Sequence, residues 1–527
     1  MATLDKRRAA LGALAIVVSV SAFAIAQGIP GGFEGVWGSN YAPAANEPEN
    51  EEAAPLAARA TASAVATSER RQRPLPTGAR SRLVHWNHIA IDASGVDHTP
   101  VADGESRVFG EQLGPGRASR AIAIVHIAIF DAVNAIYGRW QSYTGLEAAP
   151  PGASVNAAIA QAAHDTLAAM FPSQAPTFDD ALAEDLALIE ARGKADGRRV
   201  GHRAAALILA RRAGDGADAI DPQMGVEFEP SDKPGWWRQD PISLIPIALG
   251  ASWGSVKPFV LLSANQVRAM PPPDLTSSEY TRAFNEVKRL GGDGITTKTD
   301  RTPEQTQIGI FWAYDGTPSL CAPPRLYNQI TLTIADVMGT DFLGLVRLLA
   351  LTNVAMAEAG IASWESKFVY QFWRPITGIR ESDEGTGPTG AGDGNPATVG
   401  DPAWSPLGAP ASNLTGPNFT PPFPAYTSGH ATFGGALFET LRQFYGRDDI
   451  AFSFTSDEFN GVTRGANGEV RPIVTRHFTS LSQAEEENGQ SRIYLGIHWS
   501  FDKTEGIAQG RSIARYVVGH AFRNSGN

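Results

Sequence analysis

Apolar positions recur with a helical period over most of the chain after residue 83. Residues 118–137 are apolar on nearly every face and too numerous for a strand, which predicts a buried helix. Further helical periods occupy residues 155–171, 178–192, 197–212, 278–290, 326–337, 341–372, 431–444, 481–495 and 499–518. Strand-like alternation is scarce and no β-α-β-α rhythm is present. We therefore expect a mainly α fold of helical bundles, arranged as two four-helix-bundle-like units with little β structure.

The first 82 residues lack this pattern and divide into two parts. Basic residues at 6–8 precede an apolar run at 9–24, and residues 24–26 (Ala-Ile-Ala) form a small-x-small cleavage sequence. This arrangement predicts a signal peptide over residues 1–26 and a secreted or periplasmic protein. Residues 27–82 are rich in Ala, Glu, Pro, Ser and Arg and predict a disordered linker, so the catalytic unit is expected over 83–527. We see no other stretch suited to a bilayer, and expect no stable membrane span once the signal is removed.

Two long irregular regions interrupt the helical pattern. Residues 214–300 are rich in Pro, Gly and Trp around one predicted helix, and residues 381–424 are rich in Gly, Pro and Asn. Loops of this length in a compact domain are usually functional or disordered. The second region leads directly into the most informative segment of the chain.

Composition and charge exclude several classes of protein. With 43% hydrophobic and 19% charged residues, the chain can build a large core and is not wholly disordered. Its 44 Lys plus Arg against 55 Asp plus Glu leave a net charge of -11, which argues against a nucleic-acid partner. Because Cys321 is the single cysteine, an internal disulfide and a thiolate metal cage are both excluded. Any bound anion must therefore be held in a local basic pocket.

The first segment with candidate chemistry carries two cations. Lys367 and Arg374 are seven residues apart, or two helical turns, so we expect both on one face of a helix that ends near Arg374, before Pro375. Within an aromatic-rich stretch, two aligned cations are costly unless an anion neutralises them. The alternative is an exposed cationic face.

The second segment places Ser428, Gly429 and His430 at the predicted start of the helix over 431–444. The first amide groups of a helix attract anions, and a glycine lets the backbone approach closely. A histidine there can serve as an acid–base group. The alternative is a capped helix with an incidental histidine.

The third segment contains Arg492, His498 and Asp502. His498 and Asp502 are four residues apart and can share a helix face, where a carboxylate would fix the histidine tautomer. Arg492 lies six residues before His498, so on a continuous helix it would face elsewhere; it must reach the same site from a turn, or not at all. A lone His–Asp pair is more often structural than catalytic. Taken together, however, the three segments supply the donors that a tetrahedral or trigonal-bipyramidal oxyanion requires.

These three motifs resemble those of the vanadium-dependent haloperoxidases, which share a fold and anion pocket with the type 2 phosphatidic acid phosphatases. The matches are the Lys-x6-Arg-Pro motif at 367–375, Ser-Gly-His at 428–430 and Ser-Arg-x5-His-x3-Asp at 491–502. The flanks, such as PPFPAY at 421–426, are similar to the fungal chloroperoxidase branch. Thr427 stands where the usual motif has proline.

The resemblance implies a role for each matching residue. His498 would be the single protein ligand of vanadium, and His430 the acid–base catalyst. The vanadate oxygens would be bound by Lys367, Arg374, Ser428, the Gly429 amide and Arg492. Trp364 and Phe423 would line the halide site, while Asp315 and Asp502 would orient an arginine and His498.

The resemblance also implies the cofactor and the partners. Vanadate is the expected cofactor, with neither haem nor flavin. Hydrogen peroxide, a halide (bromide, with chloride less secure) and an organic acceptor are the expected partners, and no oligomeric state follows from the sequence. Two alternatives stay open. One is a secreted acid phosphatase in which His498 attacks phosphorus and His430 protonates the leaving group, and the other is a non-catalytic oxyanion-binding protein.

Overall fold

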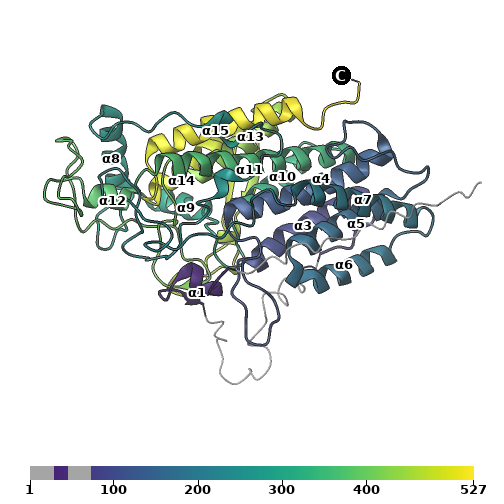
Figure 1. The fold of residues 1–527 in the computed structure, drawn as a ribbon, viewed down its shortest axis with the longest axis horizontal. Helices are drawn as coiled ribbons and strands as arrows, with labels where there is room; N and C mark the ends of the chain where they lie inside the picture. The colour runs from purple at the N-terminus through teal and green to yellow at the C-terminus, as the bar shows by residue number, and fades with distance from the viewer. Residues whose placement is uncertain (1–28, 45–69, 71–72, 527) are drawn as a thin grey trace, which may run out of the picture.

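A computed structural model describes residues 29–44, 70 and 73–526, which form a mainly helical molecule (Figure 1). In chain order the helices are α1 (Gly32–Trp37), α3 (Ala79–Asp97), α4 (Gly114–Tyr137), α5 (Val155–Met170), α6 (Ala175–Ala187), α7 (Lys194–Arg212), α8 (Ser278–Leu290), α9 (Pro303–Phe311), α10 (Pro323–Val337), α11 (Phe342–Tyr370), α12 (Pro375–Arg380), α13 (Gly429–Tyr445), α14 (Leu481–Tyr494) and α15 (Ser500–His520). The described strands form two small antiparallel pairs, β1 (Ala42–Pro43) with β2 (Leu414–Thr415) and β3 (Phe452–Thr455) with β4 (Thr475–Phe478). The predicted mainly α fold class is confirmed.

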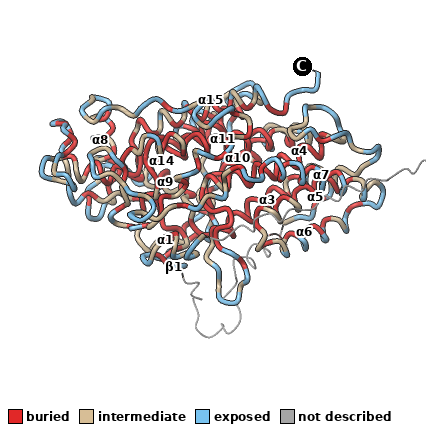
Figure 2. Tube along the Cα trace, in the orientation of Figure 1, coloured by how far each residue is buried: buried red, intermediate tan, exposed pale blue. Residues whose placement is uncertain are grey.

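The helices form two packed groups that meet at α11. In the first group α4 packs on α5 and α7, and α3 packs on α5; in the second, α13 packs on α14 and α15. Helix α11 contacts α4 of the first group and α13 and α15 of the second. Figure 2 shows buried residues concentrated along these central helices. By length and composition, and contrary to our expectation, α4 and α11 could each cross a membrane; most of each is buried in this core.

Most predicted helices are present, with a few differences at their ends. Helix α8 has the predicted bounds, whereas α6 ends at Ala187, five residues before its predicted end. The pattern analysis missed α9, which begins with a capping box between Thr302 and Gln305. It also missed α3, whose burial on several faces hides any simple apolar stripe.

The described part of the predicted linker is structured. Residues 29–44 contain α1 and β1, and Trp37 is 4% exposed against Tyr41 and Phe419. The Tyr41 hydroxyl donates to the Pro417 carbonyl at 2.9 Å. The expectation of a disordered linker is thus wrong for 29–44, and the boundary at residue 83 falls inside α3. The predicted signal peptide, residues 1–26, lies outside the described residues.

The two long irregular regions are folded against the bundles. Within the first, the backbone N–H groups of Val260 and Leu261 donate to the buried Glu358 carboxylate of α11. Within the second, the Ala409 and Phe419 backbones are bonded to each other, and β2 pairs with β1. Both regions are therefore attached to the rest of the fold by specific hydrogen bonds.

Candidate active site

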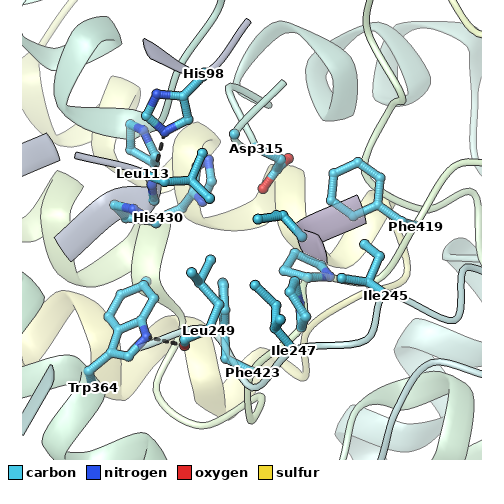
Figure 3. Close-up of a pocket in the computed structure, with 18 of the residues that line it drawn as sticks. His98, Leu113, Ile245, Ile247, Leu249, Asp315, Trp364, Phe419, Phe423 and His430 are labelled. Carbon is cyan, nitrogen blue, oxygen red and sulfur yellow. Dashed lines mark hydrogen bonds between the residues drawn. The ribbon is translucent and has the colours of Figure 1, made fainter. Parts of the chain in front are cut away.

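The three sequence motifs converge on one cavity, which encloses about 700 Å³ including its mouth (Figure 3). Its lining includes Asp315, Trp364, Phe423, Gly429, His430, Arg492 and His498. Three other predicted residues, Lys367, Arg374 and Ser428, are buried directly behind this lining. The structure therefore brings together side chains from α11, α13, α14 and the turns that follow them.

Lys367 and Arg374 do not share a helix face, which corrects the sequence expectation. Helix α11 ends at Tyr370, Gln371 turns the chain in a left-handed conformation, and Arg374 precedes α12. Both cations nevertheless bind one segment of backbone. The Lys367 Nζ donates to the carbonyls of Pro424 (2.8 Å), Ala425 (3.1 Å) and Thr427 (2.5 Å), and the Arg374 Nε donates to that of Phe423 at 2.9 Å.

Burial changes the ionisation of these two cations. Lys367 and Arg374 are at most 1% exposed, so the alternative of an exposed cationic face is wrong. Loss of solvation lowers the pKa of Lys367 well below its ordinary value, and the nearby Arg374 guanidinium lowers it further. Burial likewise lowers the pKa of Arg374 to about 9. An anion bound beside them would favour their charged forms.

His498 is held in a defined tautomer. Its Nδ1 lies 2.8 Å from Asp502 Oδ2, an acceptor, and its Nε2 lies 3.0 Å from Arg374 Nη1, a donor. The ring is therefore assigned as Nδ1–H with a lone pair on Nε2. Burial, then the cations Arg374, Lys367 and Arg492, lower the pKa of His498 well below its usual value. A neutral imidazole with its lone pair on Nε2 is the form that binds a metal, and here Arg374 Nη1 donates to that lone pair.

The His498–Asp502 pair forms across a helix start instead of along a helix face. His498 lies in the turn after α14, and Asp502 lies in the first turn of α15, where Oδ2 also accepts the Trp499 N–H at 3.0 Å. Burial raises the pKa of Asp502 to about 7. The same Asp502 oxygen thus caps α15 and orients the His498 imidazole.

Arg492 has buried donors that the described part of the protein itself does not use. This side chain is 1% exposed, and its Nη2 donates to Asp315 Oδ1 at 2.6 Å. Its Nε and Nη1 have no partner among the described residues. Buried guanidinium donors without acceptors are costly, and the oxygens of an oxyanion are strong acceptors for such donors. The donor set therefore fits an oxyanion such as vanadate.

The start of α13 supplies backbone donors and a second histidine. Ser428 caps the helix, and the first amide groups that follow have no partner within the helix. His430 Nε2 lies 2.5 Å from the Ala313 carbonyl, so this nitrogen carries the proton and Nδ1 the lone pair. Burial and the Arg492 charge lower the pKa of His430 well below its usual value. The neutral ring can therefore accept a proton.

Two aromatic rings form one wall of the cavity. The Trp364 and Phe423 ring centroids lie 4.8 Å apart at 56°. Trp364 Nε1 donates to the Leu249 carbonyl at 3.0 Å, and a Cβ at Gly250 would lie 2.3 Å from that nitrogen. Glycine at 250 is therefore required for the indole to occupy this position. Gly250 thus has a packing role at this wall.

Sequence reasoning missed several residues of the cavity. The apolar wall formed by Trp37, Ile245, Ile247 and Phe419 has no motif, since such residues are typical of any core. His98 also lines the cavity; its Nδ1 donates to the Ser94 carbonyl and its Nε2 accepts the Gly114 N–H at 2.9 Å. Among the described residues, no group of three or more His, Cys, Asp or Glu side chains is placed to hold a metal ion. A metal here would thus depend on one imidazole and on donors to its oxygens.

Comparison with known proteins gives related matches. A family model described as the VCPO second helical-bundle domain matches residues 347–526. The vanadium chloroperoxidase of Curvularia inaequalis is 33% identical over 506 residues, covering 80% of this chain and 78% of that protein. A bacterial vanadium-dependent iodoperoxidase structure has a TM-score of 0.65 at 24% identity, covering 85% of this chain and 98% of its own. A bacterial vanadium-dependent chloroperoxidase structure has a TM-score of 0.57 at 15% identity, covering 79% and 95%. These two structures share the fold.

Proposed function

The chain belongs to the vanadium haloperoxidase family, and from that premise we propose that it oxidises bromide, and also chloride, with hydrogen peroxide. In this reaction halide, peroxide and one proton give hypohalous acid and water. The observation that carries the proposal is the pair of free buried donors on Arg492, in the same cavity as a neutral His498. No other arrangement in the described part of the chain combines these two features.

The residues present fit vanadate. His498 Nε2 would be the protein ligand, because Asp502 keeps the proton on Nδ1. Arg492 Nε and Nη1, the Gly429 amide and Ser428 would donate to the oxygens, and Lys367 and Arg374 would balance the charge. When bound, the vanadium centre supplies a Lewis acid that polarises peroxide without changing its own oxidation state.

Two side chains would act on protons and electrons. Neutral His430 would accept a proton from hydrogen peroxide and later return one to the departing oxygen. Lys367, held by the carbonyls of Pro424 and Ala425, would add positive potential that draws electron density from the oxygen attacked by halide. Both roles depend on the exclusion of water, which the burial of these side chains provides.

The halide would lie against the Trp364–Phe423 wall. The Lys367 Nζ is 5.0 Å from the Phe423 ring centroid. The positive charge of Lys367 would therefore attract an anion bound on the other side of this ring. A histidine at position 423 would make this wall polar, whereas Phe423 makes it apolar and favours a weakly hydrated halide. A phenylalanine at this position resembles the chloride-oxidising branch. Bromide is easier to oxidise, so we expect bromide turnover to exceed chloride turnover.

The proposal is tested by halogenation of monochlorodimedone with orthovanadate, hydrogen peroxide and either halide. p-Nitrophenyl phosphate hydrolysis is measured in parallel with and without vanadate. We expect halogenation that depends on vanadate. Brisk phosphate release without vanadate, combined with no halogenation, would instead support the acid phosphatase alternative.

We also propose that the enzyme acts outside the cytoplasm, as a secreted or periplasmic protein. The support is the basic, apolar and small-x-small pattern of residues 1–26. N-terminal sequencing of the exported protein should begin at Gln27. Retention of residues 1–26 in the cytoplasmic fraction would refute this assignment.

A further inference from the structure

A buried carboxylate that the proposed mechanism does not use lies behind the site. Glu458 is in the short 3₁₀ helix η4 (Asp457–Phe459) and is fully buried. A charge in such a place is costly unless it is paired and hydrogen-bonded. Ser412 Oγ donates to its Oε2 at 2.6 Å, the Arg471 guanidinium donates to the same oxygen, and the Tyr314 N–H donates to Oε1 at 3.2 Å. The bond to Tyr314 connects this carboxylate to the site.

The Tyr314 N–H belongs to a peptide group whose other end binds His430. The carbonyl of that peptide group is the Ala313 carbonyl, which accepts from His430 Nε2 at 2.5 Å. Because a peptide group is planar and rigid, one unit joins the Glu458 carboxylate to the His430 ring. A negative charge on the N–H side polarises the peptide group and makes its carbonyl a stronger acceptor. This favours the His430 tautomer that leaves Nδ1 free to accept a proton.

The backbone at Tyr314 is strained, and η4 contacts both its main chain and its side chain. Tyr314 has a φ of 46°, in the left-handed region that bulky residues rarely adopt. Its side chain is fully buried, and its hydroxyl accepts the Asp457 N–H at 2.7 Å and donates to Gln329 Oε1 at 3.1 Å. Such a conformation persists only where its surroundings hold it. These contacts therefore fix the path of the chain at Tyr314.

The residue that follows Tyr314 contacts the second polar group of the site. Asp315 Oδ1 accepts from Arg492 Nη2 at 2.6 Å, and Figure 3 shows Asp315 and His430 beside the same cavity. Residues 313–315 thus supply one acceptor to His430 and another to Arg492. Glu458 binds the middle of this segment, so one carboxylate supports both contacts.

We propose that Glu458 is a positioning residue for the reaction, acting on His430 and Arg492 through residues 313–315. The inference rests on the proposed function, since it names a further residue on which turnover at the same site depends. Glu458 does not line the cavity. Its effect is therefore on the orientation and hydrogen bonding of groups that do, and not on the choice of halide.

The role at His430 is tested by a double-mutant cycle on bromination at saturating vanadate. We expect Glu458→Ala to lower kcat about tenfold in the parent but less than about twofold in a His430→Ala background, because the group on which Glu458 acts is then absent. Glu458→Gln keeps an oxygen that can accept from the Tyr314 N–H, so it should retain roughly a third or more of the parent kcat. Equal losses in both backgrounds, or a Gln variant no better than the Ala variant, would overturn the proposal.

The role at Arg492 is tested by calorimetry with orthovanadate, in the absence of peroxide and halide. We expect Glu458→Ala to weaken vanadate binding about tenfold in the parent and less than about twofold in an Asp315→Ala background. Unchanged vanadate affinity in Glu458→Ala would refute the proposal. A parent protein that binds vanadate but never oxidises bromide would refute the proposed function and leave this binding cycle to decide the role of Glu458.

A matched control separates positioning from general loss of stability. Asp185 on α6 is also a buried carboxylate paired with an arginine, Arg82 of α3, in the first group of helices. Asp185→Ala should lower the melting temperature but change kcat and vanadate affinity by less than about twofold. Losses of both in Asp185→Ala equal to those in Glu458→Ala would contradict the proposal. If Glu458→Ala does not fold, Glu458→Leu combined with Arg471→Leu removes the same acceptor without leaving an unpaired guanidinium.

Discussion

The behaviour of His498 is determined by the two groups that contact its ring. Asp502 accepts from Nδ1, and Arg374 donates to Nε2. We expect Asp502→Ala to release the ring and lower vanadate affinity roughly 10–100-fold, as for other outer partners of a ligating histidine. The vanadate concentration that gives half-maximal reconstitution measures this effect. Asp449→Ala, at a fully exposed carboxylate, is the matched control, and equal affinity in both variants would contradict the assignment.

His430 should separate turnover from cofactor binding. Its ring is neutral and lines the cavity, but it is not the predicted metal ligand. We expect His430→Ala to lower kcat by roughly 10²–10⁴-fold, with vanadate affinity within a few-fold of the parent enzyme. Steady-state bromination with saturating vanadate measures the first quantity, and a vanadate titration measures the second. Full turnover in this variant would exclude His430 as the acid–base group.

At the scale of elements, the first turn of α13 is anchored from α10 and α14. The Tyr327 hydroxyl and the Asn488 side-chain amide both donate to the His430 carbonyl, at 2.9 and 3.0 Å. Gly434 makes this possible, because a Cβ there would lie 2.3 Å from Asn488 Nδ2. The Asn488 amide thus positions the helix that carries His430, and only glycine at position 434 leaves room for this amide.

We therefore expect Gly434→Ala to displace Asn488 and destabilise the fold by about 1–3 kcal/mol. The kcat should fall as well, because His430 loses its anchor. Thermal melting and steady-state bromination measure the two effects. Gly519→Ala on α15 is the control: no atom lies within 4 Å of its added Cβ, so it should stabilise slightly, by about 0.5–1 kcal/mol. Equal melting temperatures for the two variants would contradict this account.

At the scale of the whole molecule, buried neutral histidines make the fold sensitive to acid. His126 is 1% exposed, bonds Asn87 Oδ1 at 2.9 Å, and has its pKa lowered by burial from 6.5 to about 3. Below pH 6.5 the unfolded chain takes up a proton that the folded chain cannot, so stability falls as the pH falls. From this group alone the loss at pH 5 is about 2 kcal/mol.

His126→Gln keeps a donor for Asn87 but removes the titration. We expect the variant to lose about 2 kcal/mol less stability than the parent between pH 7 and pH 5. Urea unfolding at the two pH values measures the difference, and His477→Gln on the exposed strand β4 is the matched control. Identical pH dependence in His126→Gln and the parent would contradict the assignment.

Local patterns in the sequence predicted much of the fold and the polar residues of the candidate site. Helical periodicity located most of the long helices, since a one-sided or fully apolar 3.6-residue repeat requires no tertiary information. Spacing and residue type predicted that one site contains Lys367, Arg374, Ser428, Gly429, His430, Arg492 and His498, because oxyanion binding needs strong donors that are rare in a core. The prediction that Lys367 and Arg374 share a helix face was wrong, because residue spacing does not reveal that the helix ends at a left-handed turn at Gln371.

Tertiary structure alone decided the remainder. Residues 29–44 read as a linker by composition, yet Trp37 and Tyr41 are buried against segments more than 370 residues away in sequence. The apolar part of the cavity wall has no motif, because its side chains come together only where distant loops meet. The sequence by itself thus determined which groups can hold an anion. Only the packing determined which of their atoms stay unpaired, and that depends on contacts no local pattern encodes.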